Sequence, residues 1–159
     1  MLRPLRPEDA PLLETATLGT MNWCGERFTR TDVRSRPEFR HYTHMDTSRG
    51  DFGVVATKHD APIGVVWALF LPAHDPGYGF VSATIPELSL WVDAHARGQG
   101  LGRTLLRALV SEAMSRGLAQ LSLSVEAGNV ARQLYLSEGF RDVPGRDADG
   151  VMLLSLRAR

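Results

Sequence analysis

Apolar residues recur every three or four positions over residues 101–116. The apolar positions are Leu101, Leu105, Leu106, Leu109, Val110, Ala113 and Met114. This spacing places them on one face of an α-helix. Gly117 follows directly, and glycine is the residue that most often ends a helix. The pattern predicts an amphipathic helix over 101–116.

Residues 119–125 instead alternate between apolar and polar side chains. Leu121, Leu123 and Val125 are separated by Ser122 and Ser124. Alternation with a period of two is typical of a strand with one buried face. Similar signals predict strands at 2–5, 52–57, 63–70, 88–92 and 151–156, and helices at 9–18 and 129–138.

In chain order these elements are a strand, helices, three strands, a helix, a strand, a helix and a strand. Residues 20–50 show only weak helical periodicity and are rich in polar and aromatic side chains. This order indicates a mixed α/β layer structure. Because 159 residues are enough for one full hydrophobic core, we expect residues 1–159 to form a single domain.

A glycine-rich turn lies between the predicted strand at 88–92 and the helix at 101–116. It reads Arg97-Gly98-Gln99-Gly100-Leu101-Gly102. Glycines let the backbone approach a ligand closely, and the free amides of a helix N-terminus favour anions. The turn therefore predicts a site for phosphate groups.

Three phosphate-binding patterns can be compared with this turn. The chain has no Gly-Lys pair, which excludes a Walker A loop. A dinucleotide fingerprint that begins at Gly98 would need a third glycine where Arg103 stands. The third pattern, Arg/Gln-x-x-Gly-x-Gly/Ala, is matched at every defined position by Arg97, Gly100 and Gly102.

This third pattern resembles the acyl-CoA signature of the GNAT superfamily of N-acetyltransferases. Residues 124–140, SVEAGNVARQLYLSEGF, resemble the next conserved block of that family, in which a short helix carries a tyrosine. Residues 5–10, LRPEDA, resemble its first strand and the start of its first helix. The resemblance is strongest over 86–143. It implies a GNAT-type α/β fold, with a mixed, largely antiparallel central sheet flanked by helices.

The resemblance also implies how acetyl-CoA would bind as co-substrate, without a metal. In the family two central parallel strands splay apart to admit the pantetheine arm, and the first of them bulges and frees backbone groups. The implied cofactor-binding residues are Leu90, Trp91, Val92, Arg97, Gly98, Gln99, Gly100, Leu101, Gly102, Arg103, Asn129, Ala131, Arg132 and Tyr135. Asn129 is also well suited to cap the following helix.

Two residues are the candidates for proton transfer. By resemblance Glu87, at the start of the central strand, would take the proton of an acceptor amine, directly or through water. Tyr135 would protonate the departing thiolate, since a phenol with a pKa near ~10 is close to a thiol at ~8.5. A backbone amide near Trp91 or Val92 would stabilise the oxyanion.

These residues imply an N-acetyltransferase that moves an acetyl group directly to a primary amine of a small molecule or peptide. One alternative is a non-catalytic acyl-CoA-binding module that acts as a sensor or scaffold. Another is an acyltransferase with a different acyl donor or a hydroxyl acceptor. The resemblance places the acceptor pocket in residues 20–50 and 72–80, where Asp75 and Glu26 are candidates to bind a cationic acceptor.

The amino-acid composition limits which classes of binding partner are expected. The 18 basic and 18 acidic side chains balance, which does not favour nucleic acid or an anionic membrane. Absence of a spanning segment or a signal peptide leads us to expect a cytoplasmic protein, and the family analogy allows a homodimer. Cys24 has no partner for a disulfide and is expected in the core. His41 and His44 are expected at the surface and not in a metal site.

Overall fold

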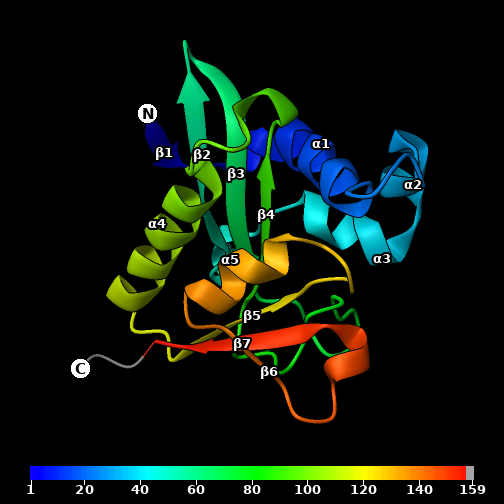
Figure 1. The fold of residues 1–159 in the computed structure, drawn as a ribbon, viewed down its shortest axis with the longest axis vertical. Coiled ribbons are helices and arrows are strands. Elements are labelled where there is room, and N and C mark those ends of the chain that lie inside the picture. The colour runs from blue at the N-terminus through cyan, green and yellow to red at the C-terminus, as the bar shows by residue number, and fades with distance from the viewer. Residues whose placement is uncertain (157–159) are drawn as a thin grey trace.

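The computed structural model describes residues 1–156, and within them seven strands form one sheet in the order β1-β2-β3-β4-β5-β7-β6 (Figure 1). The strands are β1 (Leu2–Pro4), β2 (Phe52–Lys58), β3 (Ala61–Leu69), β4 (Glu87–Val92), β5 (Gln120–Ser124), β6 (Arg141–Asp142) and β7 (Val151–Ser155). Among these strands only β4 and β5 are parallel neighbours. The predicted fold, mixed and largely antiparallel, is therefore confirmed.

The helices follow the sequence pattern where that pattern is periodic. They are α1 (Ala10–Met21), α2 (Arg30–Ser35), α3 (Pro37–Arg40), α4 (Leu101–Ser115) and α5 (Ala131–Ser137). α4 agrees closely with its prediction, whereas α1 continues three residues beyond the predicted 9–18. Strand β6 was not predicted, because two residues are too few to show an alternation. Within residues 1–156 no helix combines the length and apolar character of a bilayer-crossing segment.

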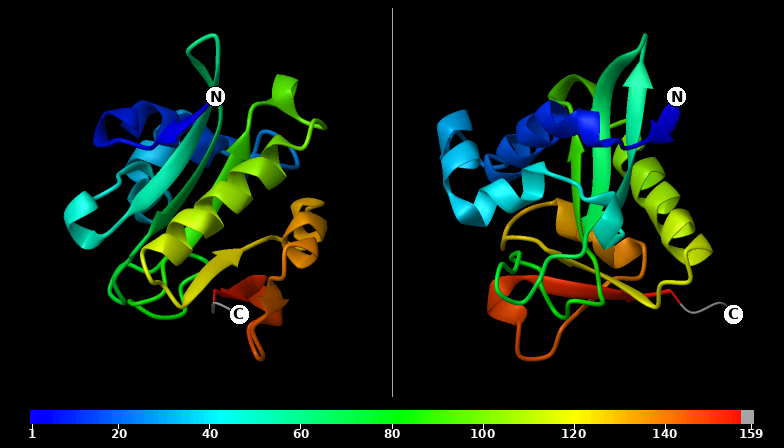
Figure 2. Two further views of the ribbon diagram at one scale, coloured as in Figure 1. Left: turned by 90° about the vertical axis from the view of Figure 1, so that its left-hand side faces the viewer. Right: turned by 180° about the vertical axis from the view of Figure 1, so that it is seen from behind.

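The helices cover the two faces of the sheet in two groups. α4 and α5 lie on one face and α1, α2 and α3 lie on the other (Figure 2). Side chains along β3 point alternately to the two faces of the sheet. Val66 and Ala68 pack in the core under α4, whereas Val65 and Trp67 pack in the core under α1. The sheet is thus the middle layer of a three-layer structure.

The central feature of the sheet is the divergence of β4 and β5. Within the described residues, the register pairs these parallel strands at one position, Glu87 with Ser122. β4 pairs with β3 along its whole length without a register shift. The bulge expected in β4 is therefore wrong, and the backbone groups on its other side are freed because β5 diverges.

Packing of α4 gives a prediction for stability. Leu109 on α4 is fully buried, whereas 47% of Met114 on the same helix is exposed. Leu109→Ala should lower the free energy of unfolding by about 2–5 kcal/mol because it leaves a cavity. Met114→Ala should change it by less than about 0.5 kcal/mol. Urea unfolding of both variants measures this, and equal losses would contradict the assigned core face.

Candidate active site

A cavity of about 900 Å³ is lined by residues from both layers of helices and from β4. Alternation directs Leu88, Leu90 and Val92 toward α4, and Glu87 and Trp91 toward α1. The lining includes all of these residues, so the cavity reaches both sides of the sheet where β4 and β5 separate. A ligand in it would contact both helix layers.

Most of the residues predicted from sequence converge on this cavity. Those that line it are Glu87, Leu90, Trp91, Val92, Arg97, Gly98, Gly100, Leu101, Gly102, Asn129, Ala131 and Tyr135. Gln99, Arg103 and Arg132 do not belong to its lining. The side chain of Arg103 pairs with Glu138, and that of Arg132 pairs with Asp142 at 2.6 Å. For Gln99 and Arg103 a contact with the cofactor stays a prediction about their backbone amides, and for Arg132 the place in the wall stays a prediction.

The glycine turn presents bare backbone to open space. Gly98 and Gly100 have positive φ angles of 76° and 80°, which glycine adopts without strain. A Cβ at either position would meet no described atom within 4 Å. The amide of Thr104 donates to the carbonyl of Gly100 at 3.1 Å, so the amides before it precede the helical hydrogen bonds of α4. This geometry suits a phosphate group.

The hydrogen bonds between β4 and β3 determine which backbone groups of β4 are left without a strand partner. The amide of Asp93 donates to the carbonyl of Ile63 at 2.9 Å across the β3 side. By alternation the amide of Trp91 also points to β3, while those of Leu90 and Val92 point toward the gap beside β5. Of the two amides proposed from sequence, the amide of Val92 faces the cavity side and that of Trp91 does not.

Glu87 is buried, although it stands at the end of a strand. It is 4% exposed, and the amide of Gly79 donates to its Oε1 atom. Its Oε2 accepts no hydrogen bond of good geometry from a described residue, although the nearby Tyr42 hydroxyl lowers the pKa of this carboxyl. Burial outweighs both donors and raises the pKa of Glu87 from 4.5 to about 7.

Two glycines let a loop close over Glu87. A Cβ at Gly77 would overlap Oε2 of Glu87 and lie 2.6 Å from the Tyr42 hydroxyl. A Cβ at Gly79 would lie 2.6 Å from Oε1. Tyr42 fixes this loop by accepting a hydrogen bond from the amide of Tyr78 at 2.8 Å. The loop and Tyr42 together enclose the carboxyl group.

Tyr135 approaches the cavity from the opposite face of the sheet. It lies on α5, is 7% exposed and packs edge-on against Phe140 with ring centroids 5.8 Å apart. Burial raises the pKa of its phenol to about 12, so the phenol is protonated at neutral pH. Asn129 lines the same wall, and its Oδ1 accepts a hydrogen bond from the amide of Ala131 at 3.0 Å, although the N-cap position of α5 is Val130 and not Asn129 as predicted.

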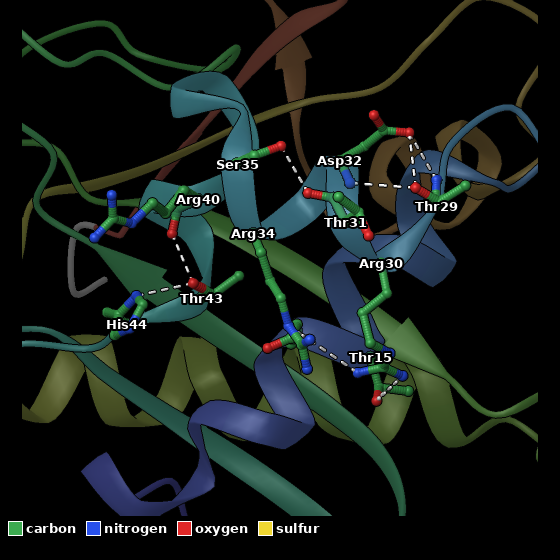
Figure 3. A network of polar contacts seen from close by, with 11 residues as sticks. Thr15, Thr29, Arg30, Thr31, Asp32, Arg34, Ser35, Arg40, Thr43 and His44 are labelled. Carbon is green, nitrogen blue, oxygen red and sulfur yellow. Dashed lines mark hydrogen bonds and ion pairs between the residues drawn. The ribbon is translucent and has the colours of Figure 1, made fainter.

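The other wall is aromatic, and periodicity did not single out its members. The aromatic lining residues are Trp23, Phe28, Phe39, Tyr42 and Tyr78. Polar contacts fix the segment that carries Phe28 and Phe39 (Figure 3). The Thr29 hydroxyl caps α2 by accepting from the amide of Asp32 at 3.3 Å, and the amide of Thr29 donates to the Asp32 carboxylate at 2.8 Å. Arg34 of α2 donates to Glu14 of α1 at 2.6 Å. A cluster of aromatic residues in a weakly helical segment was the signal available in the sequence.

Several secondary expectations fail. Cys24 is exposed and does not belong to the core, because it follows α1 in a surface turn. The side chain of His41 is 5% exposed and bonds to Asp75 at 2.9 Å, so His41 is not a surface histidine. This pairing engages Asp75, and neither Asp75 nor Glu26 lines the cavity. Among the described residues no three His, Cys, Asp or Glu side chains form a metal-binding group.

Comparison with known proteins identifies the family. Residues 18–140 match the family model described as the Acetyltransferase (GNAT) family. The chain belongs to the GNAT family. The match covers the glycine turn, β4 and α5, which are the GNAT elements around the cavity. No curated protein matches the chain in sequence.

Solved GNAT structures share this fold over nearly the whole chain. The PaiA N-acetyltransferase from Thermoplasma acidophilum, in complex with coenzyme A, is 18% identical with a TM-score of 0.70 over 98% of each chain. The putative acetyltransferase YncA from Salmonella typhimurium, with acetyl-CoA, is 21% identical with a TM-score of 0.69 over 100% of this chain and 95% of its own. A ribosomal-protein-alanine N-acetyltransferase from Brucella melitensis is 28% identical with a TM-score of 0.59 over 98% and 96%.

The raised pKa of Glu87 predicts a pH dependence of stability. Between pH 4.5 and about 7 the native protein retains a proton that the unfolded chain has released. The free energy of unfolding should therefore decrease as pH rises through this window, by on the order of 3 kcal/mol. Urea unfolding at several pH values should show this decrease in the wild type and not in Glu87→Gln. Parallel profiles for the two proteins would contradict it.

Proposed function

We propose that this protein is an N-acetyltransferase that moves an acetyl group directly from acetyl-CoA to a primary amine. The observation that carries the proposal is the buried carboxyl group of Glu87, a residue in the lining of a cavity that also contains the glycine turn and Tyr135. A buried carboxyl with a pKa of about 7 is suited to accept a proton near neutral pH. The GNAT fold and the cofactor-bound structural neighbours support acetyl-CoA as donor.

Acetyl-CoA, the donor, would be bound mainly by backbone groups and less by side chains. The amides at the start of α4 would hold the diphosphate, because Gly98 and Gly100 leave the space before them open. The pantetheine arm would extend between β4 and β5 and pair with the free backbone groups of Leu90 and the free amide of Val92, whose carbonyl accepts a hydrogen bond from Arg97. Asn129 and Ala131 would form the facing wall.

The reaction is a single displacement in which each proton has a defined route. The acceptor nitrogen attacks the thioester carbon and gives its proton, directly or through water, to the carboxylate of Glu87. An amide of Leu90 or Val92 stabilises the oxyanion. The carbon–sulfur bond then breaks, and Tyr135 donates its proton to sulfur as the charge on sulfur develops. A phenol at about 12 is a weaker acid than a free thiol, so transfer is coupled to bond breaking.

The phosphate role of the turn can be tested with two matched glycines. Gly100 and Gly117 have similar positive φ angles of 80° and 74°, and a Cβ at either would meet no described atom within 4 Å. Gly100→Ala should weaken coenzyme A binding by at least about tenfold, because the methyl group occupies the phosphate position. Gly117→Ala should lose a similar ~1 kcal/mol of stability and bind normally. Calorimetric titration measures both, and normal affinity in Gly100→Ala would refute the turn assignment.

Turnover tests the proton-transfer roles. Release of coenzyme A thiol from acetyl-CoA is followed across alkylamines, arylalkylamines, amino acids and peptides, with a control that lacks acceptor. We expect an acceptor-dependent rate that increases with pH to a plateau above about 7 as Glu87 ionises. Glu87→Gln should lower kcat about 100-fold and remove this pH dependence. Tyr135→Phe should lower kcat about 10- to 100-fold and leave acetyl-CoA affinity unchanged.

Two results would overturn the proposal. Tight acetyl-CoA binding without acceleration by any amine would indicate a binding module or a different acceptor chemistry. An unchanged kcat in both variants would remove Glu87 and Tyr135 from the mechanism.

A further inference from the structure

The half of the cavity on the α1 side has a continuous aromatic wall. The rings of Phe28 and Phe39 pack edge-on with centroids 4.8 Å apart, and Phe39 and Tyr78 follow at 6.5 Å. Phe39 is 2% exposed, whereas Tyr78 is 47% exposed and still lines the cavity. The wall therefore extends from a fixed, buried ring to an accessible one at the rim.

Most charged side chains that line this half of the cavity are paired with a side chain of opposite charge. Arg27 donates to both carboxylate oxygens of Glu126, at 2.8 and 3.1 Å. Asp149 pairs with Arg146 at 2.9 Å. Glu87 is buried, and its carboxyl group receives the amide of Gly79 and no cationic side chain among the described residues. Among the described lining residues, no cation on this side is thus free to bind a carboxylate of the acceptor.

One lining cation remains, and it lies at the other end of β4. Arg97 belongs to the glycine turn and its Nε donates to the carbonyl of Val92 at 3.1 Å. Glu87 is the first residue of β4 and Val92 the last, so a strand length separates Arg97 from the base. The charge pattern at Glu87 therefore favours an ammonium or amine group and disfavours an amino acid.

Resting on the proposed function, we propose that the acceptor is a primary arylalkylamine without a carboxylate, an aromatic ring joined by a short chain to the amine. Its ring packs against the wall of Phe28, Phe39 and Tyr78. Its amino group lies beside Glu87, to which its proton passes directly or through water. Arg36 lies over the rings of Phe28 and Phe39, at 5.4 and 5.9 Å from their centroids, so contacts between the acceptor ring and the wall, and not attraction of its amino group to the rings, select this class.

Three matched acceptors test this assignment in the thiol-release assay. They are 2-phenylethylamine, 2-cyclohexylethylamine of similar size without a π system, and phenylalanine with an added carboxylate. We expect kcat/KM for 2-phenylethylamine to exceed that for 2-cyclohexylethylamine about three- to tenfold. It should exceed that for phenylalanine about 100-fold, since the carboxylate would be buried beside Glu87 without a partner.

A substitution in the wall has a matched control. Tyr78→Leu removes the accessible ring and should raise KM for 2-phenylethylamine about three- to tenfold, which removes its advantage over 2-cyclohexylethylamine. Tyr78→Phe keeps the ring and should lose less than Tyr78→Leu. Met114→Ala is the control, because Met114 is equally exposed, at 47%, and does not line the cavity.

The outcomes separate the two proposals. If 2-cyclohexylethylamine or phenylalanine reacts as fast as 2-phenylethylamine, or if another amine reacts and 2-phenylethylamine does not, the arylalkylamine assignment is wrong and amine acetylation stands. If Tyr78→Leu lowers the rates of all three acceptors equally, the ring does not select the acceptor. If no amine in the wider panel reacts, the proposed function fails as well.

Discussion

The divergence of β4 and β5 is the constraint on which the rest of the site depends. A buried backbone amide or carbonyl without a partner costs about 1–3 kcal/mol, so a sheet does not open in its middle without a compensating partner. Here the strands pair at Glu87 and Ser122 and then separate, which leaves the inner edge of β4 unpaired. A ligand with alternating polar groups can replace the missing strand, and this explains why the cavity follows β4.

The same divergence brings opposite layers of the molecule to one space. Glu87 points toward α1, whereas Tyr135 reaches the cavity from α5. Burial raises the pKa of both groups, which suits Glu87 to accept a proton near neutral pH and makes Tyr135 a weaker acid than a free phenol. It keeps the phenol of Tyr135 protonated and raises the pKa of Glu87 to about 7. Desolvation is the leading cause in each case, so the burial of each side chain beside the cavity sets its pKa.

Much of the fold was predictable because its signals are local. The stripe of α4 and the alternation of β5 predict a helix and a strand, and both elements form. Their burial departs from the pattern at two positions, since Met114 of the apolar stripe is exposed and Ser122 of the expected polar face is fully buried. The glycine turn was predictable for the same reason, since Gly98 and Gly100 adopt the positive φ angles that their residue type allows. Short or irregular elements such as β6 and α3 carried too few residues to show a period.

By itself the sequence determined the order of the elements, the place of the phosphate turn and the candidates for proton transfer. Only the tertiary structure decided that Glu87 is buried, because Tyr42 and the loop at Gly77 and Gly79 reach it by packing that no local pattern encodes. Tertiary packing likewise assembled the aromatic wall and exposed Cys24. Periodicity reports which face is covered, whereas desolvation and pKa depend on which distant residues cover it.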